Sequence, residues 1–153
     1  MRICADENVA PLLTQLIRDS LLGKAHTLDL VDDHQARGVD DQIWVRKFAD
    51  AGGDAIVGAD AKMLTRPHEV VAIFEAGLRL VVLPGQWAQQ PKNIQIAFLF
   101  LWWPRIEKAF ETAKARQCFK VPWSWKETDT VSEFKLDFQE AQKKAKKAAR
   151  RNG

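Results

Sequence analysis

The 153-residue chain contains two cysteines, Cys4 and Cys118, and no Cys-x-x-Cys pair. Two cysteines so far apart provide no disulfide framework, and without the pair there is no zinc signature. Histidine is equally scarce, because His26, His34 and His68 do not have the spacing of zinc ligands. These shortages indicate a protein of a reducing cytoplasm, in which Cys4 is a buried thiol within an apolar N-terminal run.

Long apolar runs are absent too. The strongest late run, Ile94 to Trp103, is shorter than the about 20 residues that a membrane-spanning helix requires. Asp6 and Glu7 interrupt the N-terminal apolar run at once, which argues against a signal peptide. Neither a GxSxG, a Walker A nor a GxGxxG sequence occurs. We therefore expect a cytoplasmic protein with no membrane partner and with none of the chemistries that these motifs support.

Composition suits one globular domain followed by a tail. Apolar residues make up 46% of the chain and charged residues 28%, enough for a core of ordinary size. The formal net charge of +3 is uneven: residues 139–153 hold six basic residues and one acid, so this segment carries +5 and the rest −2. We expect a domain over 1–138 and a basic tail over 139–153. Such a tail attracts polyanions or is simply a solvated helix, and both interpretations stay open.

Strand and helix patterns alternate along the chain. The expected helix at 90–116 contains Pro104, which predicts a bend or a split in that helix. The alternation predicts an α/β fold with a mainly parallel central sheet between two layers of helices, a three-layer α/β/α arrangement in which ligands bind beyond the carboxyl ends of the strands. The expected elements are strands at 2–5, 26–31, 55–58 and 80–83, helices at 11–21, 40–51, 65–76 and 90–116, a polar loop at 32–39 and an edge strand at 121–125.

Acidic residues follow the expected strands. Asp6 comes directly after the first strand, with Glu7 beside it, and Asp60 comes shortly after the third. Asp40 and Asp41 open the helix that leads into that third strand. Carboxylates gathered at one rim raise one another's pKa unless a cation is present, and hard oxygen ligands suit Mg²⁺ or Mn²⁺. The pattern therefore predicts metal-dependent phosphate chemistry.

Each acid also has a structural alternative. Asp40 or Asp41 caps the helix, or Asp60 is an ordinary turn residue, whereas an acid that ends a central strand, as Asp6 does, seldom has a structural role. A phosphoacceptor signalling domain has a similar arrangement of acids but requires a lysine near the end of its last strand. Residues 80–85 contain none, which disfavours that class.

Several segments together resemble one family. The opening sequence MRICADENV is similar to the start of PIN-like domains, GVDDQIW to their acidic helix start, and IVGADAKM to their next strand and its following Asp. RPHE and LWWPRI resemble the VapC-type toxin subgroup of toxin–antitoxin systems. The resemblance covers roughly residues 1–110. It implies an endoribonuclease that depends on Mg²⁺ or Mn²⁺, acts on RNA and is controlled by a cognate antitoxin protein.

The resemblance also implies site residues. The catalytic, metal-binding acids are Asp6, Asp40 and Asp60, with Asp41 competing for the middle place. Many PIN domains have a fourth acid close to the third, but Ala and Lys follow Asp60 here. This difference favours, as the alternative function, a PIN-like module that binds RNA or protein without cleaving.

Basic residues near the third acid are candidates for the substrate phosphate. These are Lys62 and Arg66, although a solvated side chain explains Lys62 equally well.

The adjacent tryptophans Trp102 and Trp103 have two interpretations. Aromatic rings stack on unpaired RNA bases, but Trp102 and Trp103 lie on an apolar helix, which favours the core or a homodimer interface.

Overall fold

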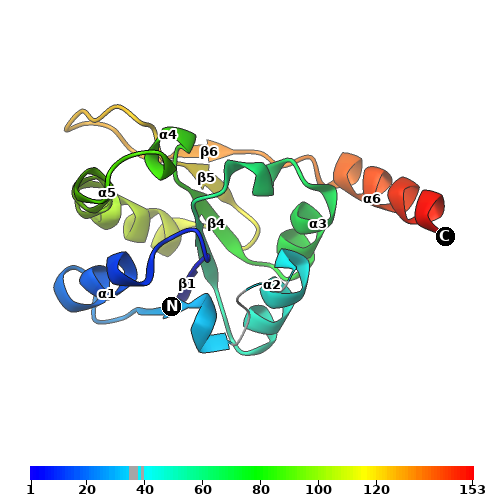
Figure 1. Cartoon of the computed structure of the whole chain (residues 1–153), viewed down its shortest axis with the longest axis horizontal. Helices are drawn as coiled ribbons and strands as arrows, with labels where there is room; N and C mark the ends of the chain where they lie inside the picture. Colours follow the sequence, from blue (N-terminus) through cyan, green and yellow to red (C-terminus); the bar gives the residue numbers. More distant parts are fainter. Residues whose placement is uncertain (35–37, 39) are drawn as a thin grey trace.

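A computed structural model describes residues 1–34, 38 and 40–153 of the chain (Figure 1). Six strands form one sheet in the order β2-β1-β3-β4-β5-β6. The first five strands run parallel, and β6 pairs with β5 in the antiparallel direction. The expected loop at 32–39 lies in large part outside the described residues. The strands are β1 (Arg2–Ala5), β2 (Thr27–Leu30), β3 (Ala55–Gly58), β4 (Arg79–Val82), β5 (Cys118–Lys120) and β6 (Ser132–Phe134).

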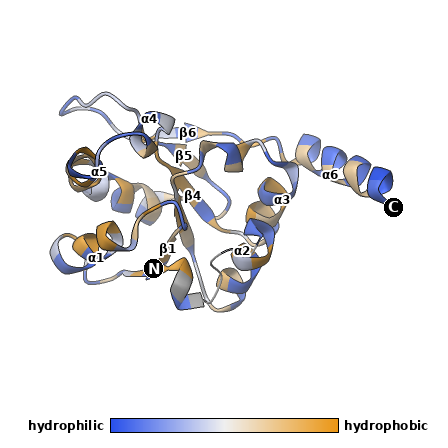
Figure 2. Cartoon of the chain, in the orientation of Figure 1, coloured by the Kyte–Doolittle hydropathy of each residue, from blue (hydrophilic) through white to orange (hydrophobic). Residues whose placement is uncertain are grey.

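Helices cover both faces of this sheet. In Figure 1, α1 and α5 lie on one face and α2 and α3 on the other, and a separate apolar core fills each side. This arrangement confirms the predicted three-layer α/β/α fold with a mainly parallel sheet. Figure 2 shows the contrast between the apolar strands and the hydrophilic α6. The helices are α1 (Pro11–Ser20), α2 (Asp41–Asp50), α3 (Pro67–Glu75), α4 (Gly85–Ala88), α5 (Lys92–Thr112) and α6 (Phe138–Asn152), with 3-10 turns η1 (Val31–His34) and η2 (Ala61–Leu64).

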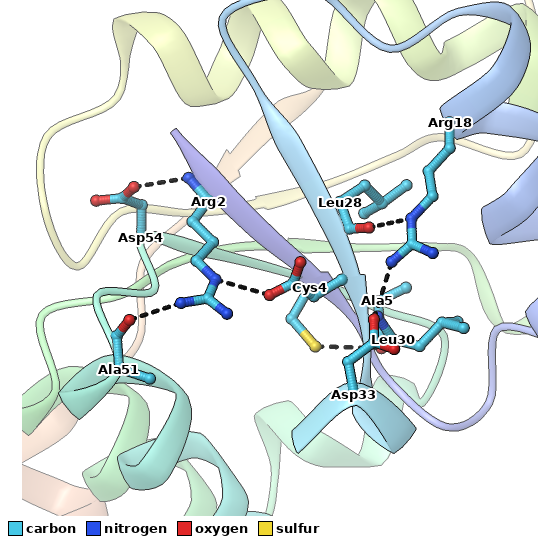
Figure 3. A network of polar contacts seen from close by, with 10 residues as sticks. Arg2, Cys4, Ala5, Arg18, Leu28, Leu30, Asp33, Ala51 and Asp54 are labelled. Atoms are coloured by element: carbon cyan, nitrogen blue, oxygen red, sulfur yellow. Dashed lines mark hydrogen bonds and ion pairs between the residues drawn. The ribbon is translucent and has the colours of Figure 1, made fainter. Parts of the chain in front are cut away.

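Polar contacts at Arg2 hold the start of β1 against its neighbours (Figure 3). Arg2 Nε donates to Asp29 Oδ2 of β2 at 2.7 Å, and Nη1 donates to the carbonyl of Ala51 at 2.7 Å. The backbone N–H of Arg2 donates to Asp54 Oδ2 at 2.8 Å, just before β3. These bonds help to fix β1 between β2 and β3, so the residue that follows β1 reaches a defined place at the sheet edge.

The predicted edge strand at 121–125 is wrong. The last parallel strand, β5, ends at Lys120, and the edge of the sheet is β6. Pro122 has no N–H for a ladder hydrogen bond. The tryptophans beyond it leave the sheet to pack on α5, where Trp123 stacks on Phe98 at 5.4 Å and Trp125 meets Trp102 edge-on at 5.1 Å.

The long helix α5 is not split at Pro104. The proline is exposed on the helix, so the carbonyl that loses its partner can turn to water. Trp102 and Trp103 on the same helix are 0% and 2% exposed, which supports the core interpretation over base stacking. Among the described helices, none combines the length and apolarity that crossing a membrane requires.

Candidate active site

Asp6 is a buried carboxylate at the carboxyl end of β1. It is 2% exposed, and its two oxygens accept hydrogen bonds from the backbone N–H groups of Asn8 and Ala59, both at 2.9 Å. A Cβ added to Gly58 would lie 3.3 Å from Asp6 Oδ2, so the absence of a side chain allows this close approach. Burial raises the pKa of Asp6 to about 6, although both backbone hydrogen bonds act in the opposite direction.

Of the two adjacent acids, Asp41 is the one that belongs to this site. Its Oδ1 accepts a hydrogen bond from Trp44 Nε1 at 2.7 Å, and its negative charge contributes to the raised pKa of Asp6. Asp40 is exposed at the N-cap of α2 and makes no capping hydrogen bond with its side chain. For the second of the three acids that the family resemblance implies, the structure therefore favours Asp41 over Asp40.

Arg66 joins three carboxylates that come from three different elements. Its guanidinium lies 3.1 Å from Asp60 Oδ2, 2.9 Å from Glu69 Oε1 and 3.6 Å from Asp41 Oδ2. Asp60 also caps η2, because its Oδ1 accepts from the backbone N–H of Lys62 at 2.9 Å. Asp60 is thus a turn residue and a member of the acidic cluster at once, which the sequence presented as alternatives.

Glu69 is a member of the site that the sequence analysis missed. Its side chain is 12% exposed, and its Oε2 is buried with no hydrogen-bond partner. Burial raises its pKa above the usual value, while Arg66 opposes the shift. The signal was available in Arg66-Pro67-His68-Glu69, since Pro67 at the first helical position places Glu69 in the first turn of α3. Glu69 thus adds an acid to the cluster nine residues after Asp60, and the two share Arg66.

The other candidates from the sequence are Glu7, Lys62 and Arg66, and of these three described residues only Arg66 contacts the acids through its side chain. Glu7 is exposed and accepts a hydrogen bond from the backbone N–H of Gly38 at 3.2 Å. The Lys62 side chain is exposed, in agreement with the solvated alternative. Arg66 is engaged with carboxylates, so it is not free for a phosphate in this conformation.

The donors of this site suit a hard divalent cation. Asp6, Asp41, Asp60 and Glu69 offer only carboxylate oxygens, and the orphaned Glu69 Oε2 is an unused ligand atom. Among the residues that the structure describes, no three such side chains already lie close enough together to hold a metal ion. Arg66 is the cation that touches three of the four acids instead.

The PIN-like domain family model matches residues 1–85, more than half of the chain. The chain belongs to the PIN-like domain family. This is a nuclease-type fold family, and the matched segment contains Asp6, Asp41, Asp60 and Glu69. No curated protein and no solved structure matches the chain.

The raised pKa of Asp6 makes the stability of this PIN-like domain depend on pH. Because the folded pKa of about 6 exceeds the ordinary 3.8, the folded state binds more protons, and the stability contribution of Asp6 falls as pH rises through this interval. We expect the unfolding free energy of the wild type, minus that of Asp6→Asn, to fall by about 1 kcal/mol between pH 5 and pH 7. Urea titrations at each pH measure it. A difference that is flat or rises over this range would contradict the buried, protonatable Asp6.

Proposed function

We propose that the chain is a Mg²⁺- or Mn²⁺-dependent endoribonuclease and the VapC-type toxin of a type II toxin–antitoxin pair. The proposal depends on one observation in a PIN-like domain: Arg66 joins Asp41, Asp60 and Glu69, and the charge of Asp41 also acts on the buried Asp6. Four carboxylates at one rim are costly to assemble without a cation, so their presence favours a cation-binding purpose.

Each acid has a defined part in this proposal. Asp6, Asp41, Asp60 and Glu69 would hold the ion, which would supply an activated water and neutralise the charge that develops on the leaving oxygen. The backbone N–H groups of Asn8 and Ala59 keep the Asp6 carboxylate in one orientation. Trp44 Nε1 does the same for Asp41. The unpartnered Glu69 Oε2 would be a ligand atom for the ion.

The adjacent pair Asp40 and Asp41 provides a matched test of this site. Both substitutions to Asn remove one negative charge from the start of α2, but only Asp41 contacts the cluster. We expect Asp41→Asn to reduce Mn²⁺-dependent RNA cleavage at least about 100-fold. Asp40→Asn should remain within about threefold of the wild type, as surface changes do. Equal losses in both variants, or no loss in Asp41→Asn, would contradict the site.

The toxin assignment is tested with the same two variants in cells. Expression of the wild-type chain should slow growth, Asp41→Asn should relieve the effect, and Asp40→Asn should not. The toxin proposal implies a small antitoxin protein encoded by an adjacent gene, and its co-expression should also restore growth. A wild-type chain that is abundant, folded and harmless, and that leaves RNA intact with Mn²⁺, would favour the non-cleaving module instead.

We further propose that α6 contributes to RNA binding. The helix starts against α3, where Phe138 stacks on Phe74 at 3.9 Å, and then extends away from the domain (Figure 1). A groove of about 320 Å³ lies between the start of α3 and the start of α6, and its walls include Thr65 and Pro67, which flank Arg66, as well as Lys144. The groove thus starts beside the backbone of Arg66 and ends at α6, and its wall also includes Asp137 and Glu140, of which Glu140 pairs with Lys144 at 2.5 Å. We propose that the RNA backbone follows this groove toward the exposed cations of α6.

Charge substitutions on α6 test this path. Because Ala141 is buried, truncation would disturb packing, and replacement of exposed cations is cleaner. Replacing Lys146, Lys147, Arg150 and Arg151 with Gln should weaken binding of single-stranded RNA and reduce its salt slope by up to about 3. A control with the same charge change at exposed Lys24, Lys92, Lys108 and Lys114 should show a smaller effect. Equal effects of both variants would show that net charge alone matters.

One observation favours the alternative, a PIN-like module that binds RNA or protein without cleavage. Arg66 partly neutralises the acids without a metal, and no group of three metal-binding side chains is preformed among the described residues. The cleavage assay separates the two functions, because a pure binding module has no Mn²⁺-dependent activity for Asp41→Asn to remove.

A further inference from the structure

In Asp41 and Asp60, Arg66 contacts the carboxylate oxygen that has no other hydrogen-bond donor. In Asp60, Oδ1 accepts from the backbone N–H of Lys62, and the guanidinium contacts Oδ2. In Asp41, Oδ1 accepts from Trp44 Nε1, and the guanidinium contacts Oδ2. In both residues, one oxygen is held by a hydrogen-bond donor, and the other oxygen is the one that a cation can contact.

The same guanidinium is poorly anchored. Its side chain is 46% exposed, and the hydrogen bonds that the structure gives it within the cluster are to carboxylates alone, with Glu69 Oε1 at 2.9 Å as the closest. Arg2, by contrast, also donates to the carbonyl of Ala51. Because the side chain is half-exposed and its partners are the acids themselves, a cation that binds those acids can displace Arg66 toward water.

The charges make two simultaneous cations unfavourable at these oxygens. A guanidinium and a divalent ion a few ångströms apart repel each other strongly at the edge of a protein. Arg66 and a bound metal therefore compete for Asp41, Asp60 and Glu69, although the three carboxylates attract both.

We propose that Arg66 is an exchangeable counter-ion: it partly neutralises Asp41, Asp60 and Glu69 in the metal-free protein, yields them to the divalent ion, and then contacts the RNA phosphate. The inference rests on the proposed nuclease function. The planar guanidinium of Arg66 binds phosphate as well as carboxylate. Because Arg66 directly precedes α3, the side chain stays near the acids after it moves. Arg66 thereby has two roles: it pairs with the acids when no metal is bound, and it contacts the substrate when the metal is bound.

Substitution of such a residue should change Mn²⁺ affinity and RNA cleavage in opposite directions. Free Mn²⁺, counted by its electron paramagnetic resonance signal without RNA, reports metal affinity. We expect Arg66→Ala and the bulkier Arg66→Gln to bind Mn²⁺ at least about tenfold more tightly than the wild type. At saturating Mn²⁺, the same variants should cleave RNA about tenfold or more slowly, because the phosphate contact is lost. Arg46→Ala, which removes an exposed arginine paired with Glu75 on α3, should change neither quantity.

Other outcomes separate the two proposals. If the wild type cleaves RNA with Mn²⁺ but both folded Arg66 variants bind Mn²⁺ equally or more weakly, Arg66 is a structural clamp and the exchange is wrong. If neither the wild type nor the Arg66 variants bind Mn²⁺ in a way that Asp6→Asn abolishes, the nuclease proposal itself fails. Circular dichroism establishes that each variant is folded, and agreement between Ala and Gln excludes a local packing effect.

Discussion

The hydrogen bonds that hold Asp6 between the ends of two parallel strands determine the geometry of the whole site. Its oxygens accept from Asn8 and Ala59, and its own N–H donates to the carbonyl of Val57 at 3.0 Å. The bonds with Ala59 and Val57 tie the end of β1 to the end of β3, next to the pairing of Ala5 with Val57, and the bond from Asn8 fixes the turn that follows β1. A buried carboxylate is normally unfavourable, and here the backbone donors offset only part of the cost.

The other three acids carry more negative charge than the one arginine among them can offset. Asp41, Asp60 and Glu69 come from separate elements, and one arginine offsets only part of their combined charge. The net negative charge that remains is a physical reason to expect a divalent partner, and the orphaned Glu69 Oε2 is an atom that such a partner would use. The fold thus keeps these acids together in a partly neutralised state, and in the proposed function a divalent ion would take the place of the arginine.

Much of the fold and half of the candidate site follow from the sequence alone. Short apolar runs separated by amphipathic helices indicate the parallel sheet, and acids that follow strands, as Asp6 and Asp60 do, necessarily reach its carboxyl edge. The sequence leaves Asp40 and Asp41 unresolved because adjacent helical residues point about 100° apart, and the exact helix start decides which faces the sheet. Glu69 was missed since its position depends on the tertiary placement of α3. The strand β6 has too few residues for a period-two pattern.

If Asp6, Asp41, Asp60 and Glu69 form one site for a divalent cation, anomalous diffraction from a crystal of the wild-type protein grown with Mn²⁺ will locate the ion there. We expect a Mn²⁺ peak roughly 2.0–2.3 Å from carboxylate oxygens of Asp6 and of at least one of the other three acids, with Arg66 displaced from them. A fully occupied Mn²⁺ elsewhere, or none at a concentration that supports cleavage while these acids are well ordered, would contradict it.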